Sequence, residues 1–212
     1  MAIAETKKLK IVQVGFSDRD GAGGAGIALY RLHRCLIESG HQSNILSRMK
    51  SLRTDESESI PRSVTELFLR KITVPLGLNG LEGVGSFSIR KHRFYKEADI
   101  LHLHGIHSGY FNYMALPRLT QGKPTVWSQH DIWGITGHCT FSYDCQRWKT
   151  GCGHCPYPNH YPAIKRDATA IEWKLKKRTY GRSKIHIVVP SKWFLGLLKD
   201  SLFSVFQTHH IP

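Results

Sequence analysis

Four polar side chains that could bind a sugar or move a proton stand where two apolar runs of the sequence end. The runs are residues 98–105 (ADILHLHG) and 123–131 (KPTVWSQHD). The four side chains are His104, His107, His130 and Asp131. Imidazole titrates near neutral pH, so it can donate a hydrogen bond to a sugar hydroxyl or transfer a proton. Any one of these histidines could instead be a hydrogen-bonded structural residue, but the group favours a ligand site.

A glycine-rich stretch, residues 20–26 (DGAGGAG), offers a second kind of chemistry. A glycine turn lets backbone N–H groups approach an anion, and the N-terminus of the helix that follows favours negative charge. Gly23 and Gly24 are therefore candidates for contact with a phosphate or a sugar. The spacing resembles the dinucleotide-binding fingerprint only loosely, and a tight turn that needs positive φ is the alternative.

Four of the five cysteines fall in one short segment with the spacing C-x5-C-x6-C-x2-C. They are Cys139, Cys145, Cys152 and Cys155. Four thiolates complete a tetrahedron around zinc and leave no open position, so the ion would be structural. A nearby histidine could replace one thiolate, and two disulfides or four free thiols stay open as alternatives. The fifth cysteine, Cys35, lies in a helical pattern and is predicted to be a small buried apolar residue.

Strands and helices alternate along the chain, and they must position these residues. Apolar runs predict strands at residues 9–15, 42–48, 98–105, 123–131 and 185–190. Helical patterns lie at residues 27–41, 64–72, 113–119, 164–180 and 193–198. We expect one α/β domain over residues 1–212, a Rossmann-like parallel sheet with helices on both faces, and a compact insertion at residues 132–162. Ligands bind outside the carboxyl ends of the strands in such sheets, which is where the histidines should converge.

The charge balance points to anionic partners. Lys and Arg total 30 of 212 residues against 16 Asp and Glu, a formal net charge of +14. The basic helix predicted at residues 164–180 is either a solvated face or a surface for an anionic membrane, with Trp173 at headgroup level. No apolar run approaches the ~20 residues that span a bilayer, and the N-terminus lacks the pattern of a signal peptide. We expect a cytoplasmic protein, peripheral at the inner face of the membrane.

Several segments together resemble the N-terminal half of a GT-B glycosyltransferase of the family 4 (group 1) type. They are IVQVG, GGAGIALYRLHRCLIESGH, ADILHLHGIH, SQHDIW and VVPSKWFLGLLK. The segment HDIWGITGHCTFSYDCQRWKTGCGHCP resembles a cysteine-bearing insertion in a subset of these enzymes that is linked to bacterial polysaccharide synthesis.

This resemblance implies a retaining transferase that moves a sugar from a nucleotide-sugar donor to the hydroxyl of a glycan or lipid-linked acceptor. Gly23 and Gly24 match the loop beside the donor phosphates, and His130 matches a histidine that contacts the transferred sugar, with Asp131 beside it. No catalytic metal is expected. Family members continue into a second Rossmann-like domain with the donor site, so we expect the isolated chain to be inactive without that half or a partner subunit.

Two other functions compete with this interpretation. The charge and the cysteines would also suit a zinc-stabilised nucleic-acid-binding module, but the basic residues are scattered, so we expect no nucleic acid partner. The chain could also be a non-catalytic partner of a full-length transferase.

Overall fold

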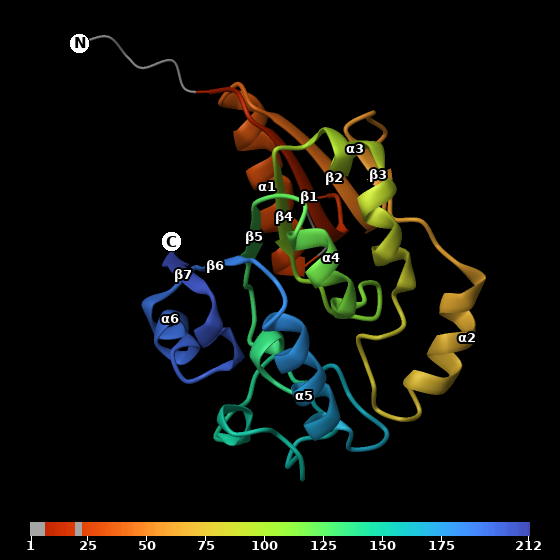
Figure 1. Ribbon diagram of the computed structural model, residues 1–212, viewed down its shortest axis with the longest axis vertical. Coiled ribbons are helices and arrows are strands. Elements are labelled where there is room, and N and C mark those ends of the chain that lie inside the picture. The colour runs from red at the N-terminus through yellow and green to blue at the C-terminus, as the bar shows by residue number, and fades with distance from the viewer. Residues whose placement is uncertain (1–6, 20–22) are drawn as a thin grey trace.

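The computed structural model describes residues 7–19 and 23–212 and contains a seven-stranded sheet in the order β3-β2-β1-β4-β5-β6-β7 (Figure 1). Every neighbouring pair of strands is parallel. The strands are β1 (Lys10–Ser17), β2 (Gln42–Met49), β3 (Ser57–Ser59), β4 (Ile100–His104), β5 (Thr125–Ser128), β6 (His186–Val189) and β7 (Gln207–His210). The predicted parallel α/β fold is confirmed. The short strands β3 and β7 were not predicted.

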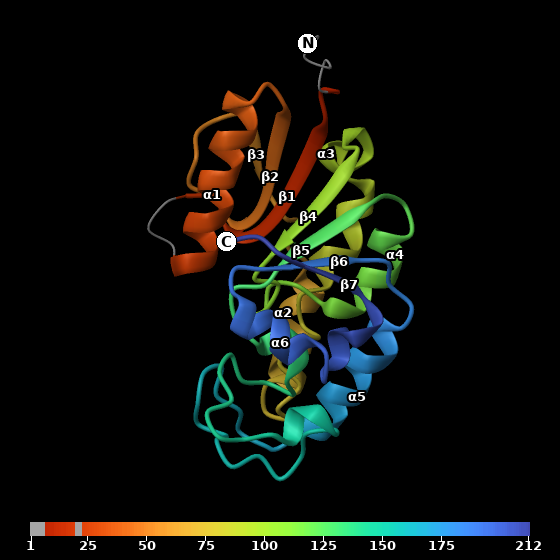
Figure 2. The ribbon, with the colours of Figure 1, turned by 90° about the vertical axis from the view of Figure 1, so that its left-hand side faces the viewer.

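Helices cover both faces of this sheet. They are α1 (Gly23–Glu38), α2 (Val64–Thr73), α3 (Arg93–Glu97), α4 (Leu116–Thr120), α5 (Thr169–Tyr180) and α6 (Lys192–Leu198). Helix α1 lies on one face, and α3 and α4 lie on the other (Figure 2). Short 3-10 helices are η1 (Val84–Lys91), η2 (Tyr113–Ala115), η3 (Trp133–Ile135), η4 (Arg147–Lys149) and η5 (Leu202–Val205). Among the described residues, no helix is both long and apolar enough to cross a bilayer.

The central strands are apolar because helices shield them on both sides. Val12 and Val14 of β1 are fully buried, and so are Leu101 and Leu103 of β4. The register aligns Val12 with Leu101 and Val14 with Leu103, so these side chains form continuous layers of the core. A buried parallel strand reads as a nearly continuous apolar run, which is why the sequence alone located these strands.

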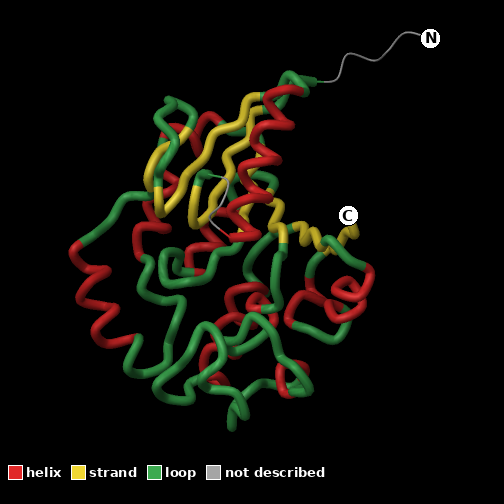
Figure 3. Tube along the Cα trace, turned by 180° about the vertical axis from the view of Figure 1, so that it is seen from behind, coloured by secondary structure: helices red, strands yellow, loops and turns green. Residues whose placement is uncertain are grey.

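Residues 132–162 are mostly loop, with η3 and η4 as their regular elements (Figure 3). This insertion packs on α5 through Trp148, which is buried, and whose carbonyl accepts a 2.7 Å hydrogen bond from the indole N–H of Trp173. Trp173 is itself buried, so the predicted placement of this side chain at the headgroups of a membrane is wrong. Helix α5 also begins at Thr169 rather than at Ile164.

Cys35 corrects a second prediction, since it is exposed on α1 rather than buried. The buried residues of this helix are Gly26, Leu29 and His33. A single cysteine at helical spacing is compatible with either face, and the packing of Leu29 against the sheet decided which face turns inward.

Lys176 of α5 is fully buried beneath the start of the insertion. Its Nζ donates hydrogen bonds to the carbonyls of Trp133, at 2.8 Å, and Thr136, at 3.0 Å, and lies 3.4 Å from the centre of the Trp133 ring. Burial lowers the pKa of Lys176 to about 8. The Trp133 carbonyl also accepts a 3.3 Å hydrogen bond from the Thr136 N–H within η3. The buried ammonium therefore adds a second donor to this carbonyl and links the turn to α5.

Replacing this lysine tests that role. We expect Lys176→Met to lower the free energy of unfolding by roughly 2 kcal/mol, because the Thr136 carbonyl loses the Lys176 donor and the Trp133 carbonyl loses one of its donors, while the side-chain length is kept. Urea unfolding measures the change. Lys174→Met, on the exposed side of the same helix, is the matched control and should change stability by about 0.5 kcal/mol at most. Equal stability of the wild type and Lys176→Met would contradict the assignment.

Candidate functional site

A cavity of about 420 Å³ opens at the carboxyl ends of the central strands. Along the chain, β2 and β3 are added on one side of β1, and β4 to β7 are added on its other side. The strand order therefore reverses between β1 and β4. Ligands of open α/β folds bind at such a switch point. Five of the six predicted site residues line this cavity, and these are Gly23, Gly24, His107, His130 and Asp131.

His104 lies behind this cavity rather than in its wall. Its ring is buried and stacks on the ring of His130 with the centroids 5.6 Å apart. The ring of His102, which shares its face of β4, is tilted against it at 4.2 Å. His104 Nδ1 is 3.4 Å from His130 Nε2. Burial lowers the pKa of His102 to about 4 and that of His104 well below its usual value. These two imidazoles are neutral at pH 7 and support His130.

A chain of hydrogen bonds links the other site residues. Asp131 Oδ2 lies 2.8 Å from His107 Nε2, and His107 Nδ1 lies 2.8 Å from Ser108 Oγ. Ser108 Oγ is in turn 2.6 Å from the hydroxyl of Tyr161. One consistent direction runs along this chain: Tyr161 donates to Ser108, Ser108 donates to His107, and His107 donates to Asp131. The phenol oxygen at its open end keeps lone pairs free toward the cavity.

Asp131 connects this hydrogen-bond chain to the fold. Its second oxygen, Oδ1, accepts a 2.8 Å hydrogen bond from the backbone N–H of Trp133, the first residue of η3. Because Lys176 holds the carbonyl of the same Trp133, the orientation of the carboxylate depends on α5. His130, next to it, retains access to solvent, and its pKa is lowered mainly by partial burial of the ring, with the Asp131 charge opposing.

The glycine start of α1 faces open space. Gly23 has a φ of +79°, which favours glycine, and a Cβ placed on Gly23 or Gly24 would meet no atom within 4 Å. Across the cavity, Gly105 has a φ of +45°, and its Cβ position lies 3.2 Å from the Ala25 side chain. The loop after β4 therefore closes on the first turn of α1. Residues 20–22 of the glycine-rich stretch lie outside the described residues.

Comparison with known protein families identifies the family of this chain. The model of Glycosyltransferase Family 4 matches residues 22–204, which include every wall residue named above. The chain belongs to glycosyltransferase family 4. The nucleic-acid-binding alternative is not favoured by this membership.

One curated relative of this family 4 chain is WcaC of Escherichia coli (strain K12), which is named as a colanic acid biosynthesis glycosyl transferase. The two sequences are 41% identical over 75 residues, which cover 32% of this chain and 18% of the relative. The aligned segment is therefore less than a fifth of the length of WcaC.

Two polar side chains of the cavity wall, Ser108 and Tyr161, were missed from the sequence. Ser108 follows His107 directly and has a φ of +68°, an uncommon conformation for a residue other than glycine. Its place in the sequence, between a histidine and a glycine after a strand, was a usable signal. Tyr161 had none, because it lies at the far end of the insertion and only tertiary folding brings it to the loop after β4.

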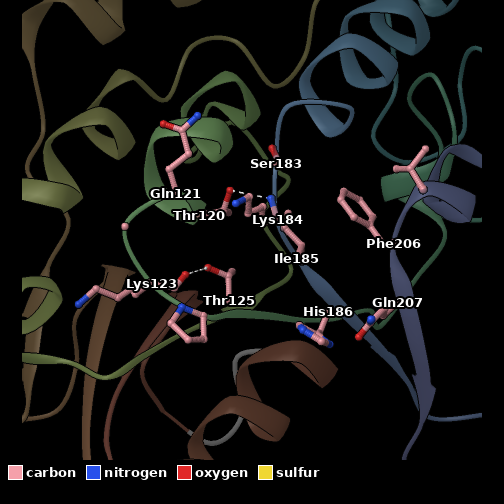
Figure 4. A pocket seen from close by; sticks show the side chains of 13 residues that line it. Thr120, Gln121, Lys123, Thr125, Ser183, Lys184, Ile185, His186, Phe206 and Gln207 are labelled. Atoms are coloured by element: carbon pink, nitrogen blue, oxygen red, sulfur yellow. Dashed lines mark hydrogen bonds between the residues drawn. The ribbon is translucent and has the colours of Figure 1, made fainter.

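A larger cavity, of about 580 Å³, lies at the opposite edge of the sheet (Figure 4). It sits at the amino ends of β5, β6 and β7, where Thr120 Oγ1 accepts a 3.0 Å hydrogen bond from the Lys184 N–H. None of the predicted site residues lines it. We assign the site to the smaller cavity because the carboxyl ends of parallel strands carry the convergent polar groups.

The four clustered cysteines line a separate small cavity of about 20 Å³ inside the insertion. All four are free thiols, and the Gly137 N–H donates to Cys152 Sγ at 3.2 Å. In the part of the chain that the structure describes, no set of three or more His, Cys, Asp and Glu side chains is placed so that it could hold a metal ion. The predicted coordination set is thus brought together, but the thiols are not arranged around one point.

The stacked histidines make stability depend on pH. Because the pKa of folded His102 is about 4, below its ordinary value of 6.5, the unfolded chain binds this proton first as pH falls. The free energy of unfolding should therefore decrease between pH 6.5 and pH 4. We expect His102→Gln to reduce this decrease by up to roughly 3 kcal/mol, measured by urea unfolding at several pH values. His154→Gln, at an exposed position, should leave the slope as it is, and identical slopes for all three proteins would refute the prediction.

Proposed function

We propose that this site binds a nucleotide-sugar and an acceptor hydroxyl and serves glycosyl transfer in polysaccharide synthesis. The observation that carries the proposal is the single cavity at the switch point, lined jointly by the glycine start of α1, by His107 and by His130 with Asp131. Family 4 membership and the name of the E. coli relative support the reaction class.

The residues suit the two halves of the reaction. The bond between the sugar C1 and the donor phosphate breaks, and the nucleoside diphosphate leaves as an anion. The backbone N–H groups of the first turn of α1 would stabilise this anion, because the positive end of the helix dipole lies there. The space before Gly23 and Gly24 leaves room for phosphate oxygens to approach the backbone.

The acceptor oxygen forms the new bond to C1 and loses a proton. The phenol oxygen of Tyr161 would accept this proton as each donor of the chain passes its own proton on, from Tyr161 to Ser108, from Ser108 to His107 and from His107 to Asp131, so the carboxylate ends protonated. His130 would donate to a hydroxyl of the transferred sugar, since its ring borders the cavity and its other side is backed by His104. These roles place the sugar between the start of α1 and the ends of β4 and β5.

The complete enzyme would have the GT-B architecture and act at the cytoplasmic face of the membrane on a glycan or lipid-linked acceptor. A second Rossmann-like domain, or a partner subunit, would then supply the rest of the donor site. The family resemblance supports this assembly, and the chain in hand would be its acceptor-side half.

Ligand binding by this chain tests the proposed site. We expect a nucleoside diphosphate-sugar to shift the imidazole NMR signals of His107 and His130, and Gly24→Val to weaken binding at least about tenfold, because its side chain fills the space for the phosphates. Gly196→Val is the matched control, since a Cβ there also meets open space but lies on α6, away from the cavity. Binding that Gly24→Val leaves unchanged would overturn the proposal.

We also propose that the four clustered thiols hold a structural zinc ion. They line one cavity of about 20 Å³, which is room for one small atom, and the thiolate donor set is the one zinc prefers. Binding requires the four side chains to turn toward the centre of this cavity. Such an ion would staple the loops of the insertion and so fix the segment that carries Tyr161.

Metal analysis of the purified chain tests the zinc proposal. We expect one zinc per chain, and we expect Cys152→Ser with Cys155→Ser to lose it and to lower the melting temperature, since thiolate ligation is coupled to folding. Cys35→Ser, at the exposed cysteine of α1, should retain the full zinc content. Wild-type protein without zinc after growth in zinc-supplemented medium would refute the proposal.

A further inference from the structure

Helix α2 presents its apolar side to solvent. The exposed fractions are 84% for Val64, 68% for Leu67, 63% for Phe68 and 45% for Ile72. This i, i+3, i+4, i+8 spacing forms one stripe, whereas the buried residues of α2 are Glu66 and Thr73. A helix at the surface of a globular protein normally turns its apolar side toward the core and its polar side toward water. The exposed stripe therefore marks an interaction surface.

Polar contacts hold α2 in this orientation. Glu66 Oε2 forms an ion pair with Arg48 at 2.9 Å, and Glu66 Oε1 accepts a 3.0 Å hydrogen bond from the Gly85 N–H. Ser63 caps the first turn through its hydroxyl. Turning the apolar stripe inward would bury it at the cost of exposing these contacts and breaking the ion pair, so the outward orientation belongs to the fold.

The exposed surface of α2 is cationic as well as apolar. Arg62, Arg70 and Lys71 are exposed beside the stripe. The single carboxylate of the helix, Glu66, faces inward and is paired. Apolar side chains flanked by Lys and Arg are the pattern of helices that lie in the headgroup region of a bilayer.

We propose that α2 docks this protein on an anionic bilayer surface. Leu67, Phe68 and their apolar neighbours enter the boundary between headgroups and acyl chains, while Arg70 and Lys71 lie among lipid phosphates. Each cation near such a surface contributes on the order of 1 kcal/mol. The charge complementarity selects an anionic bilayer over a neutral apolar partner. The docking does not depend on the proposed transfer reaction.

The docking surface adjoins the candidate site. A cavity of about 250 Å³ is lined by Arg70 of α2 and by Val74 just after it, and it shares Ser108 and Tyr161 with the site cavity. Figure 1 shows α2 at the edge of the molecule opposite the C-terminus. A bilayer against α2 would therefore lie beside the entrance to the hydrogen-bond chain, where an acceptor carried by a lipid would arrive.

Vesicle sedimentation of the full chain tests the docking. Vesicles of phosphatidylcholine with about a third phosphatidylglycerol should bind the protein, and pure phosphatidylcholine vesicles should bind at least about tenfold less. We expect Leu67→Gln with Phe68→Gln to weaken binding about tenfold or more through lost apolar contact. The matched control, Ile171→Gln with Trp193→Gln, changes side chains that are 54% and 60% exposed on α5 and α6 and should keep wild-type binding.

Several outcomes would overturn the proposal. These are no binding of the wild type to anionic vesicles, equal loss in both double variants, or a concentration-dependent dimer that only the α2 variant abolishes. The last result would assign the stripe to a second copy of the chain. Urea unfolding of each variant establishes that it is folded, and no nucleotide-sugar is present, so failure here leaves the transfer proposal unaffected.

Discussion

The orientation of the polar groups at the candidate site depends on a buried lysine. Lys176 reaches from α5 to two backbone carbonyls of the loop after β5, at Trp133 and Thr136, and packs on the Trp133 ring. The N–H of Trp133 orients Asp131, and Asp131 orients His107. The same helix carries Glu172, whose pKa is raised by burial to about 7 and whose carboxylate accepts a hydrogen bond from Tyr113. The geometry at the sheet edge thus depends on polar groups that lie deep behind it.

The site also shows how burial sorts histidines by role. His102 and His104 lie on the same face of β4 with their ring centroids 4.2 Å apart, and burial keeps both neutral. His107 and His130 lie past the strand ends, where the cavity reaches them. Parallel strands bring such loops to one edge, and reversal of strand order between β1 and β4 opens the space between them. One residue type therefore serves as support in the sheet and as a contact group at its edge.

The insertion and α2 border the same entrance from two sides. Tyr161 comes from the end of the insertion, and Arg70 comes from α2, and both line the cavity next to the site. The sequence pointed to the basic helix α5 as the surface for a membrane, with Trp173 exposed. The structure instead buries Trp173 and exposes the apolar stripe of α2. The helix with the most basic residues packs its tryptophan inward against the insertion, while a less charged helix presents apolar side chains to solvent.

The sequence by itself determined the parallel α/β fold, the places of most strands, and the convergence of His107, His130 and Asp131, whereas His104, predicted with them, lies behind the cavity. These follow from patterns within single elements and from the rule that parallel strands end at one edge. Tertiary structure alone decided that Tyr161 joins the site, that Cys35 and α2 face outward, and that Trp173 and Lys176 face inward. Contacts between residues far apart in the chain decide which side of a helix is buried and which loop reaches a cavity. Local periodicity does not reveal these contacts.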